Sequence, residues 1–268
     1  MNLQQLPAEV RRFVGDAPLW RDPVGESPCR VYRFDRGGAG FFLKLCPKPY
    51  VATTYSALRE ARVLDWLAGA SRLRVPELVL AVGAAEGECL ITRELPGRPL
   101  SALMGSEPAA AEAVLAEALH QLQAVPLRDC PFDSGLDMRL AELGQLIERG
   151  LCADDAELLG YPGLPANAAP AAVLEHLART RPAQEDWVFS HGDLCDANIF
   201  VDEREQLHFL DLGRGGRADR WLDIAFAVRA LRDDLDEGEA AAQRLLQGLG
   251  RPDQAERRRY FELLDELF

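Results

Sequence analysis

The chain has 268 residues, of which 48% are hydrophobic and 27% are charged, with 30 Lys and Arg against 43 Asp and Glu. This composition excludes a disordered, a collagen-like and a disulfide-stapled chain, and the length suffices for one large core or two smaller ones. The formal net charge of −13 argues against a nucleic-acid partner, because contacts to phosphates need a basic face. The charge is uneven, with a net +3 over residues 1–100 and a net −16 over residues 101–268.

The cysteines and the first residues bear on where the protein works. The six cysteines form no C-x-x-C pair, so neither a zinc site nor a disulfide framework is expected. The first twenty residues hold no apolar run typical of a secretory signal, and no stretch approaches the ~18 apolar residues of a membrane span. We expect a cytoplasmic protein with no membrane partner, working as a monomer or a weak dimer.

The first hundred residues are predicted to be rich in strands. Residues 29–34 and 40–46 are β-branched and aromatic runs on either side of Asp35-Arg36-Gly37-Gly38, which is a hairpin signal. Residues 53–69 have apolar side chains at helical spacing and end at a glycine. Residues 76–95 read as two more strands around a glycine-containing turn, and the Pro-Gly-rich stretch at about 92–99 is predicted to be a linker.

Beyond the linker the pattern becomes mostly helical. Residues 161–170, with three prolines, are expected to form a loop. Helices are predicted over residues 107–125, 137–149, 171–181, 219–235, 238–249 and 253–267.

Lysine is rare in this chain. Of the 30 cationic side chains only Lys44 and Lys48 are lysines, and 28 are arginines. Because the lysine ammonium is a compact point charge and the arginine guanidinium a planar fork, a retained lysine is a candidate for a site that needs the compact group. Lys48 lies beside two prolines and is expected on the solvated surface.

One stretch of the second part, residues 187–214, is strand-like. Within it residues 198–202 and 207–211 are short strands around the polar turn 203–206. If 202 faces 207, Asn198 lies directly opposite Asp211, with Cβ atoms roughly 4.5–5.5 Å apart. A carboxylate and an amide oxygen at this separation can share a hard cation such as Mg²⁺.

A third polar residue precedes this hairpin. Asp193 lies on the loop that enters it, where a carboxylate is well placed to accept a proton from a hydroxyl nucleophile or to orient it. His191 is expected to shape the loop through hydrogen bonds and not to take part in chemistry. Asp219 and Asp223 are expected to be structural, capping and tethering the next helix.

This order of residues resembles the protein-kinase signature, in which the catalytic Asp serves the hydroxyl acceptor while an Asn and a later Asp hold two Mg²⁺. The resemblance requires a strand lysine that binds nucleotide phosphates and a helix glutamate that pairs with it, and Lys44 and Glu60 fit these roles. The glycine-rich phosphate loop is missing, so phosphate contacts are assigned to the turn around Ser27. The matching letters are His191-Gly192-Asp193, Asn198 and Asp211-Leu212-Gly213.

The full chain resembles the aminoglycoside 3'-phosphotransferases in the segments HGDLCDANIF, LDLGRGGRADRWLDIAFAVR and LLDELF. The resemblance implies a bilobal, protein-kinase-like α+β fold, with a small nucleotide-binding lobe over residues 1–95 and a larger helical lobe over residues 100–268. It implies ATP and two Mg²⁺ ions, with the nucleotide between the lobes. It also implies that Phe42 stacks on adenine and that the backbone of Thr92, Arg93 and Leu95 bonds to it.

The acidic second part fits a polycationic aminoglycoside substrate. The final helix places Asp265, Glu266 and the terminal carboxylate of Phe268 at a helix C-terminus, where negative charge opposes the macrodipole, so a cationic ligand is expected there. Arg214 is expected to organise its loop or to bind a carboxylate within the substrate region. The resemblance adds Asp155, Glu157, Arg229, Asp233 and Asp234 as substrate-contacting residues.

Three other functions remain open at this point. Another small-molecule kinase, acting on choline, a sugar amine or a macrolide, would share the same core residues, although choline needs an aromatic cage and only 7% of the chain is aromatic. A non-catalytic nucleotide-binding module would have lost a Lys, Asp or Asn of the signature. A protein kinase would need a longer activation segment and an Ala-Pro-Glu after Asp211.

Overall fold

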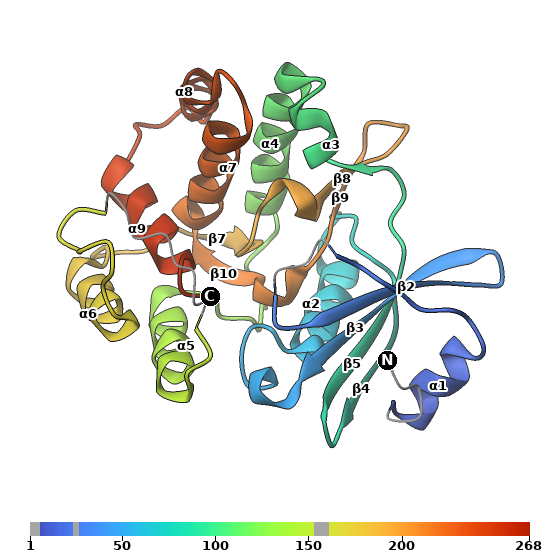
Figure 1. Ribbon diagram of the computed structural model, residues 1–268. Helices are drawn as coiled ribbons and strands as arrows, with labels where there is room; N and C mark the ends of the chain where they lie inside the picture. The colour runs from blue at the N-terminus through green and yellow to red at the C-terminus, as the bar shows by residue number, and fades with distance from the viewer. Residues whose placement is uncertain (1–5, 24–26, 153–160) are drawn as a thin grey trace. The chain divides into compact units, whose positions relative to one another are not determined.

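The computed structural model describes residues 6–23, 27–152 and 161–268, and these fall into two compact units. The first unit comprises residues up to Arg98 together with Asn198–Arg214, and the second comprises Pro99–Ala197 and Gly215–Phe268. The first is built around a β-sheet and the second is mostly helical, as an α+β chain requires (Figure 1). None of the described helices combines the length and the apolar character that crossing a membrane requires.

An antiparallel sheet forms the core of the first unit. The hairpin predicted around Gly37 and Gly38 is present, and both glycines have positive φ (59° and 79°), as a tight hairpin turn of this kind demands. The sheet has the order β1-β2-β3-β5-β4. Its strands are β1 (Trp20–Arg21), β2 (Arg30–Arg36), β3 (Ala39–Pro47), β4 (Leu78–Ala84) and β5 (Gly87–Arg93).

Each face of this sheet is covered by one helix. Because successive strand residues point to opposite faces, alternate residues of β3 enter different clusters. Phe41 and Leu43 pack in a cluster with Val10 of α1 (Ala8–Val14). Cys46 belongs to a cluster with Ala57 of α2 (Ala57–Ala70), so Lys44, two residues before Cys46, lies on the α2 side.

The strands β8 (Ile199–Val201) and β9 (Leu207–Phe209) pair in a register that differs from the prediction. Phe200 faces His208, and the Leu210 N–H donates to the Asn198 carbonyl oxygen at 2.8 Å. Asn198 is thus opposite Leu210 and not opposite Asp211. The predicted register was wrong because the loop has three residues, with Glu205 in the left-handed conformation (φ 58°), and not four.

This hairpin groups with the first unit, whereas the sequence assigned it to the second lobe. The Phe209 N–H donates to the Arg74 carbonyl oxygen at 2.9 Å, and Arg74 forms a parallel bridge with His208. The 3-10 turn η4 (Leu212–Arg214) packs against α2. Short-range pattern alone does not reveal these contacts, since they join segments more than 130 residues apart in the chain.

Helices surround a small two-stranded sheet in the second unit. The helix α7 is buried on nearly all sides and packs against α4, α8, α9 and the strand β7, so it is the centre of this unit (Figure 1). Its N-cap is Asp219, whose carboxylate accepts the Trp221 N–H at 3.0 Å, which confirms the predicted capping role. The elements are α3 (Ser101–Met104), α4 (Pro108–Gln123), α5 (Leu136–Arg149), α6 (Pro170–Thr180), β7 (Trp187–Ser190), β10 (Gly216–Asp219), α7 (Arg220–Asp234), α8 (Gly238–Gly248) and α9 (Ala255–Asp265).

Candidate functional site

A buried charge cluster lies in the first unit, formed by side chains of β3, of α2 and of the segment that follows β9. The Lys44 ammonium group of β3 donates to Glu60 Oε2 of α2 at 2.8 Å and to Asp211 Oδ1 at 2.6 Å. The side chains of Lys44 and Glu60 are only 12% and 5% exposed, whereas that of Asp211 is 37% exposed. The predicted Lys44–Glu60 pair is therefore present, and the structure adds Asp211 to it.

Burial and the neighbouring charges act in opposite directions on the pKa values of Lys44 and Glu60. Burial lowers the pKa of Lys44, but the carboxylates of Asp211 and Glu60 outweigh this effect and keep that pKa well above its usual value. Burial raises the pKa of Glu60, and the nearby Asp211 carboxylate adds to this, while the Lys44 ammonium opposes both. The cluster therefore presents one buried cation and a partly exposed carboxylate.

Backbone geometry turns the Asp211 side chain to this position. Asp211 has a positive φ of 54°, which is uncommon for a residue other than glycine and is typical of functional sites. Two residues later, a Cβ at Gly213 would lie 2.8 Å from the Thr54 carbonyl oxygen, so only glycine allows this approach. The Asp-x-Gly order thus serves both the carboxylate and the packing of η4.

The residues Asn198 and Asp211 fit a magnesium ion by the chemistry of their donors. Both supply oxygen ligands, and Mg²⁺ takes few protein ligands and completes its shell with water and phosphate. Asn198 is buried at the end of the 3-10 turn η3 (Asp196–Asn198). In the described ranges no group of three or more His, Cys, Asp or Glu side chains gathers as a metal centre would.

The loop that carries Asp193 belongs to the second unit and is held by the buried Asp223 of α7. The Asp223 carboxylate accepts the Ser190 hydroxyl at 2.8 Å, the His191 N–H at 2.8 Å and the Gly192 N–H at 3.0 Å. Burial raises the pKa of Asp223, and the His191 ring and these hydrogen bonds act against it. Asp223 was predicted only to tether its helix, and the structure shows that it organises the loop next to Asp193.

Asp193 itself is half-buried, and its neighbour His191 is fully buried. Gly192, between them, has a φ of 81° that glycine adopts readily. The burial and the backbone contact of His191 agree with the predicted role in shaping the loop.

Some residues predicted to contact adenine lie together at one end of the first sheet. Phe42 of β3 faces Thr92 of β5 across the ladder, so these two side chains share the face that bears Lys44. The Arg93 N–H already donates to the Glu77 carbonyl oxygen at 3.0 Å, so the predicted backbone contact of Arg93 is restricted to its carbonyl oxygen. Leu95 is half-buried beyond the strand.

Ser27 is described, but the turn that precedes it is not. It is half-buried in a bend, and residues 24–26 lie outside the described residues. The assignment of phosphate contacts to this turn therefore stays a prediction.

The acidic C-terminus is paired with an arginine of the same unit. Arg229 of α7 donates to Asp265 Oδ2 at 2.7 Å and lies 3.9 Å from Glu266 Oε1, and the Tyr161 hydroxyl donates to Glu266 at 3.4 Å. Burial lowers the pKa of Arg229, but Asp265 and Glu266 raise it above its usual value. Arg229 therefore already offsets part of the negative charge at this helix end, and the expected cationic ligand stays a prediction.

The remaining predicted substrate residues are dispersed. Asp233 is exposed and pairs with its neighbour Arg232 at 3.0 Å. Burial, Asp196 and Asp233 raise the pKa of Asp234. Arg214 belongs to the first unit, where it donates to the Tyr55 hydroxyl at 2.8 Å and lies over the ring of Tyr55, so it organises its surroundings there.

Two predicted substrate residues, Asp155 and Glu157, lie outside the described residues. One residue that the sequence did not single out is Arg139 of α5, which is only 2% exposed. The signal that could have found it is an arginine at an apolar position of the helical period in LDMRLAEL.

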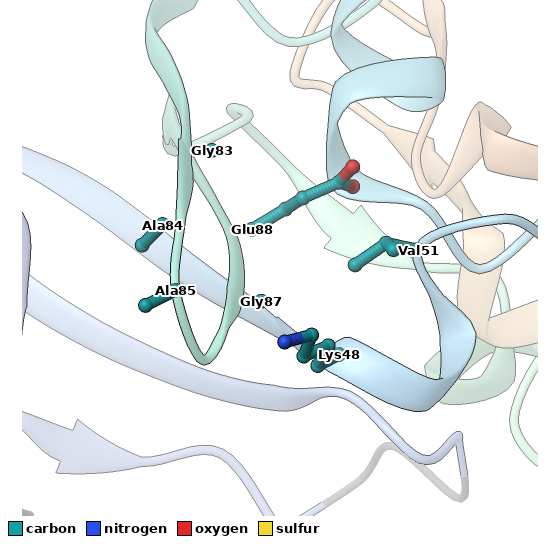
Figure 2. Close-up of a pocket in the computed structure, with 7 residues that line it drawn as sticks. All are labelled: Lys48, Val51, Gly83, Ala84, Ala85, Gly87 and Glu88. Carbon is teal, nitrogen blue, oxygen red and sulfur yellow. The ribbon is translucent and has the colours of Figure 1, made fainter.

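An open hollow of about 470 Å³ lies beside the turn between β4 and β5 (Figure 2). It contains none of the residues that the sequence assigned to the site. The Glu88 carboxylate accepts the Ser56 hydroxyl at 2.7 Å and the Leu58 N–H at 3.1 Å, which places it at the start of α2. Lys48 is exposed, as predicted, and the lining comprises Lys48, Val51, Gly83, Ala84, Ala85, Gly87 and Glu88.

Comparison with known proteins identifies the family. A sequence model of the phosphotransferase enzyme family matches residues 23–261. The chain belongs to this family. The phosphotransferase is 38% identical to the aminoglycoside 3'-phosphotransferase of Acinetobacter baumannii, over 98% of this chain and 99% of that protein. It is 33% identical to the aminoglycoside 3'-phosphotransferase of Enterococcus faecalis, over 100% of both chains.

Solved structures agree with this assignment. The crystal structure of aminoglycoside-3'-phosphotransferase of type VIII superposes on the phosphotransferase with a TM-score of 0.79 at 32% identity, covering 97% of each chain. The aminoglycoside phosphotransferase APH(3'')-Id of Streptomyces rimosus gives a TM-score of 0.78 at 27% identity, covering 96% of this chain and 95% of that one. The resemblance and the protein-kinase-like α+β fold predicted from the sequence are confirmed.

Proposed function

We propose that this phosphotransferase transfers the γ-phosphoryl group of ATP to the 3'-hydroxyl of aminoglycoside antibiotics and thereby inactivates them. The observation that carries the proposal is the buried lysine of β3, bonded to a helix glutamate and to the aspartate of Asp-x-Gly. This arrangement is the one that kinases use to bind nucleotide phosphates. The substrate class is inferred from the relatives named as aminoglycoside 3'-phosphotransferases.

The nucleotide is assigned to residues of the first unit. Lys44, oriented by Glu60, contacts the α- and β-phosphates, and Phe42 stacks on adenine beside the backbone of Thr92 and Leu95. A related structure, APH(3'')-Id of Streptomyces rimosus, was solved in complex with ADP and streptomycin, which supports a nucleotide substrate. Since the donor is ATP, we infer that the protein acts in the cytoplasm.

Asn198 and Asp211 are assigned to two Mg²⁺ ions. When bound, these ions neutralise charge on the β- and γ-phosphate oxygens. Asp211 has to exchange part of its contact with Lys44 for this role, and its side chain is 37% exposed. The assignment predicts that activity requires added magnesium.

Asp193 is assigned to the acceptor hydroxyl. It orients the 3'-hydroxyl for in-line attack on the γ-phosphorus and accepts its proton. As the hydroxyl oxygen forms its bond to phosphorus, the bond to the bridging oxygen breaks and ADP leaves. The loop contacts of Asp223 keep the Asp193 backbone in place for this step.

The acceptor is assigned to the acidic C-terminal segment. Asp265, Glu266 and the carboxylate of Phe268 attract the ammonium groups of an aminoglycoside, and Arg229 holds the first two in position. Asp155, Glu157, Asp233 and Asp234 supply further negative charge in this proposal. The transferred phosphate adds negative charge to the drug, which weakens its attraction to an anionic RNA target.

The proposal is tested by ATP turnover with three antibiotics. Kanamycin carries a 3'-hydroxyl, tobramycin lacks it, and streptomycin tests the 3''-specificity of another relative, the streptomycin 3''-kinase of Streptomyces griseus, which is 31% identical over 77% of this chain. We expect phosphorylation of kanamycin only. Equal turnover of tobramycin would refute 3'-specificity, and turnover of streptomycin alone would assign the chain to the 3'' class.

A matched control separates transfer to the drug from loss of ATP to water. The Asp193→Ala variant is run beside the wild type, with ADP release and drug phosphorylation measured together. Kanamycin phosphorylation at the wild-type rate by this variant would refute the role assigned to Asp193.

A further inference from the structure

A buried arginine lies beside the catalytic loop in the second unit. Arg139 is on α5 and only 2% of it is exposed. Burying a guanidinium is unfavourable unless its N–H groups find acceptors, so a retained buried arginine needs a compensating set of contacts. The contacts that Arg139 makes join two segments that the proposed function uses.

The first segment is the loop that carries Asp193. Arg139 Nη2 donates to the Gly192 carbonyl oxygen at 3.0 Å, and Nε donates to the Ser134 carbonyl oxygen at 3.2 Å. The Gly192 carbonyl belongs to the same planar peptide as the Asp193 N–H. Fixing the direction of this carbonyl therefore fixes the peptide plane from which the Asp193 side chain departs.

The two peptide groups that flank Gly192 are held by two different side chains, one that follows Gly192 in the sequence and one that precedes it. The Gly192 N–H donates to the Asp223 carboxylate at 3.0 Å, and the Gly192 carbonyl accepts from Arg139. Gly192 lies between these contacts with a φ of 81°. Because glycine has no Cβ, its ψ angle is restricted less than that of other residues. Asp223 thus holds the peptide plane before Gly192, and Arg139 holds the one after it.

The second segment is the C-terminus. The guanidinium carbon of Arg139 lies 5.9 Å from the centre of the Phe268 ring, within the range of a cation–π contact. Phe268 is tied back to the last turn of α9, since its N–H donates to the Asp265 carbonyl oxygen at 3.0 Å. Thus a single buried guanidinium contacts both the segment that the proposed function assigns to the acceptor and the loop of Asp193.

We propose that Arg139 is a positioning residue that couples the C-terminal acceptor segment to the catalytic loop, so that the placement of Phe268 sets the alignment of Asp193. This inference rests on the proposed function, because it assigns a role in that reaction. Arg139 does not touch the reacting atoms. It acts through the Gly192 carbonyl, and Phe268 acts through Arg139.

A double-mutant cycle on kcat tests this coupling. Arg139→Met removes the charge and the donors at similar length, Phe268→Leu removes the ring, and the double variant removes both. With kanamycin and ATP saturating, we expect Arg139→Met to lower kcat at least tenfold with the KM for ATP within twofold of wild type. The double variant is expected to be no slower than Arg139→Met, since the ring acts on the loop only through the arginine.

The outcome that overturns the coupling is a double variant whose loss in kcat equals the product of the two single losses, which means that the residues act independently. A kcat of Arg139→Met within twofold of wild type overturns the positioning role. If Arg139→Met does not fold, the cycle is run with Arg139→Lys, which keeps the buried cation, and the same two criteria apply.

A matched control variant and the activity of the wild type distinguish failure of the coupling from failure of the proposed function. Arg181 also contacts α5, donating to Asp137 at 2.6 Å, but its side chain is 37% exposed and this partner is not a residue of the Asp193 loop, so Arg181→Met is expected to retain wild-type kcat. Absence of kanamycin phosphorylation by the wild type would refute the proposed function. If the wild type is active and the two single losses in kcat multiply in the double variant, the coupling is refuted and the proposed function stands.

Discussion

The two units of the phosphotransferase handle the charge of their functional residues in different ways. In the first unit the charged groups neutralise one another, with Lys44 bonded to both Glu60 and Asp211. In the second unit Asp193 is held through the backbone of its loop, by the buried carboxylate of Asp223. In the first unit a substitution therefore reduces both stability and activity, because removing one charge leaves the others buried without their partner. At Asp193 activity can be reduced without loss of stability.

The largest effect is expected from Lys44→Met. This change leaves Glu60, which is 5% exposed, without its cation, and breaking a buried pair by removing one partner costs about 3–5 kcal/mol in the free energy of unfolding. ATP binding is lost with it. Urea unfolding measures the first effect and nucleotide titration the second.

The matched control is Lys48→Met, since Lys48 is the second lysine of the chain and is exposed. Its free energy of unfolding should stay within about 0.5 kcal/mol of wild type. Equal destabilisation by the two variants would show that the loss of stability does not come from the charge cluster in particular.

Asp193→Asn is expected to separate activity from stability. General base catalysis by a positioned group contributes about 10²–10⁴-fold, so kcat should fall by this factor. The side chain is half-buried and the substitution preserves its shape, so the free energy of unfolding should change by less than about 0.5 kcal/mol. Steady-state kinetics and urea unfolding on the same samples make the comparison, and a loss of stability as large as that of Lys44→Met would contradict it.

Asp265→Asn is expected to act on acceptor binding. A hydrogen bond to a charged group contributes about 1.5–3 kcal/mol, so the KM for kanamycin should rise roughly tenfold or more while kcat changes little. The control is Asp253→Asn, which makes the same change of charge near the other end of α9, where Asp253 pairs with Arg258 at 2.8 Å. If both variants raise the KM alike, the effect is one of overall charge and not of the C-terminal segment.

The smallest effect is expected from a substitution of Asp202, in the hairpin between Asn198 and Asp211, and it is an effect on stability. The His208 ring and the N–H groups of Gln206 and Arg204 lower the pKa of Asp202 to about 2, from an ordinary value of 3.8. A lowered folded-state pKa adds stability above pH 3.8, and this stability is lost as the pH falls through 2.

Asp202→Asn should therefore unfold more easily than wild type at pH 6, and the difference should shrink as the pH falls below 3.8 and vanish below pH 2. Urea midpoints measured across this range for both proteins make the test. A difference that does not change with pH would contradict the contribution of the Asp202 charge.

Local pattern and motif spacing predicted much of the fold and the core of the site. The strands around Gly37 and Gly38, the helix that presents Glu60 and the partnership of Lys44 with Glu60 followed from hairpin signals and kinase-like order. The register of the later hairpin was wrong by one residue, because the sequence does not show that Glu205 adopts the left-handed conformation. A one-residue slip moves every side chain to the other face, which is why the predicted opposition of Asn198 and Asp211 failed.

Contacts between distant segments could not be predicted from spacing. The pair between Arg229 and Asp265 joins residues 36 apart, and the contact between Arg139 and Gly192 joins residues 53 apart. A helix-dipole argument identified the acidic end of α9 as unusual but could not name the cation that meets it. Such partners depend on how helices pack, and this is settled by the whole core and not by any one segment.

The most direct test of the account is the position of the phosphate on the product. Kanamycin is converted by the wild-type protein with ATP and magnesium, and the product is examined by two-dimensional correlation of ³¹P with ¹H. We expect a single product whose phosphorus correlates with the proton at C3', and none when Asp193→Asn is used for the same time. A phosphorus signal correlated with any other ring proton, or an unchanged yield with Asp193→Asn, would contradict it.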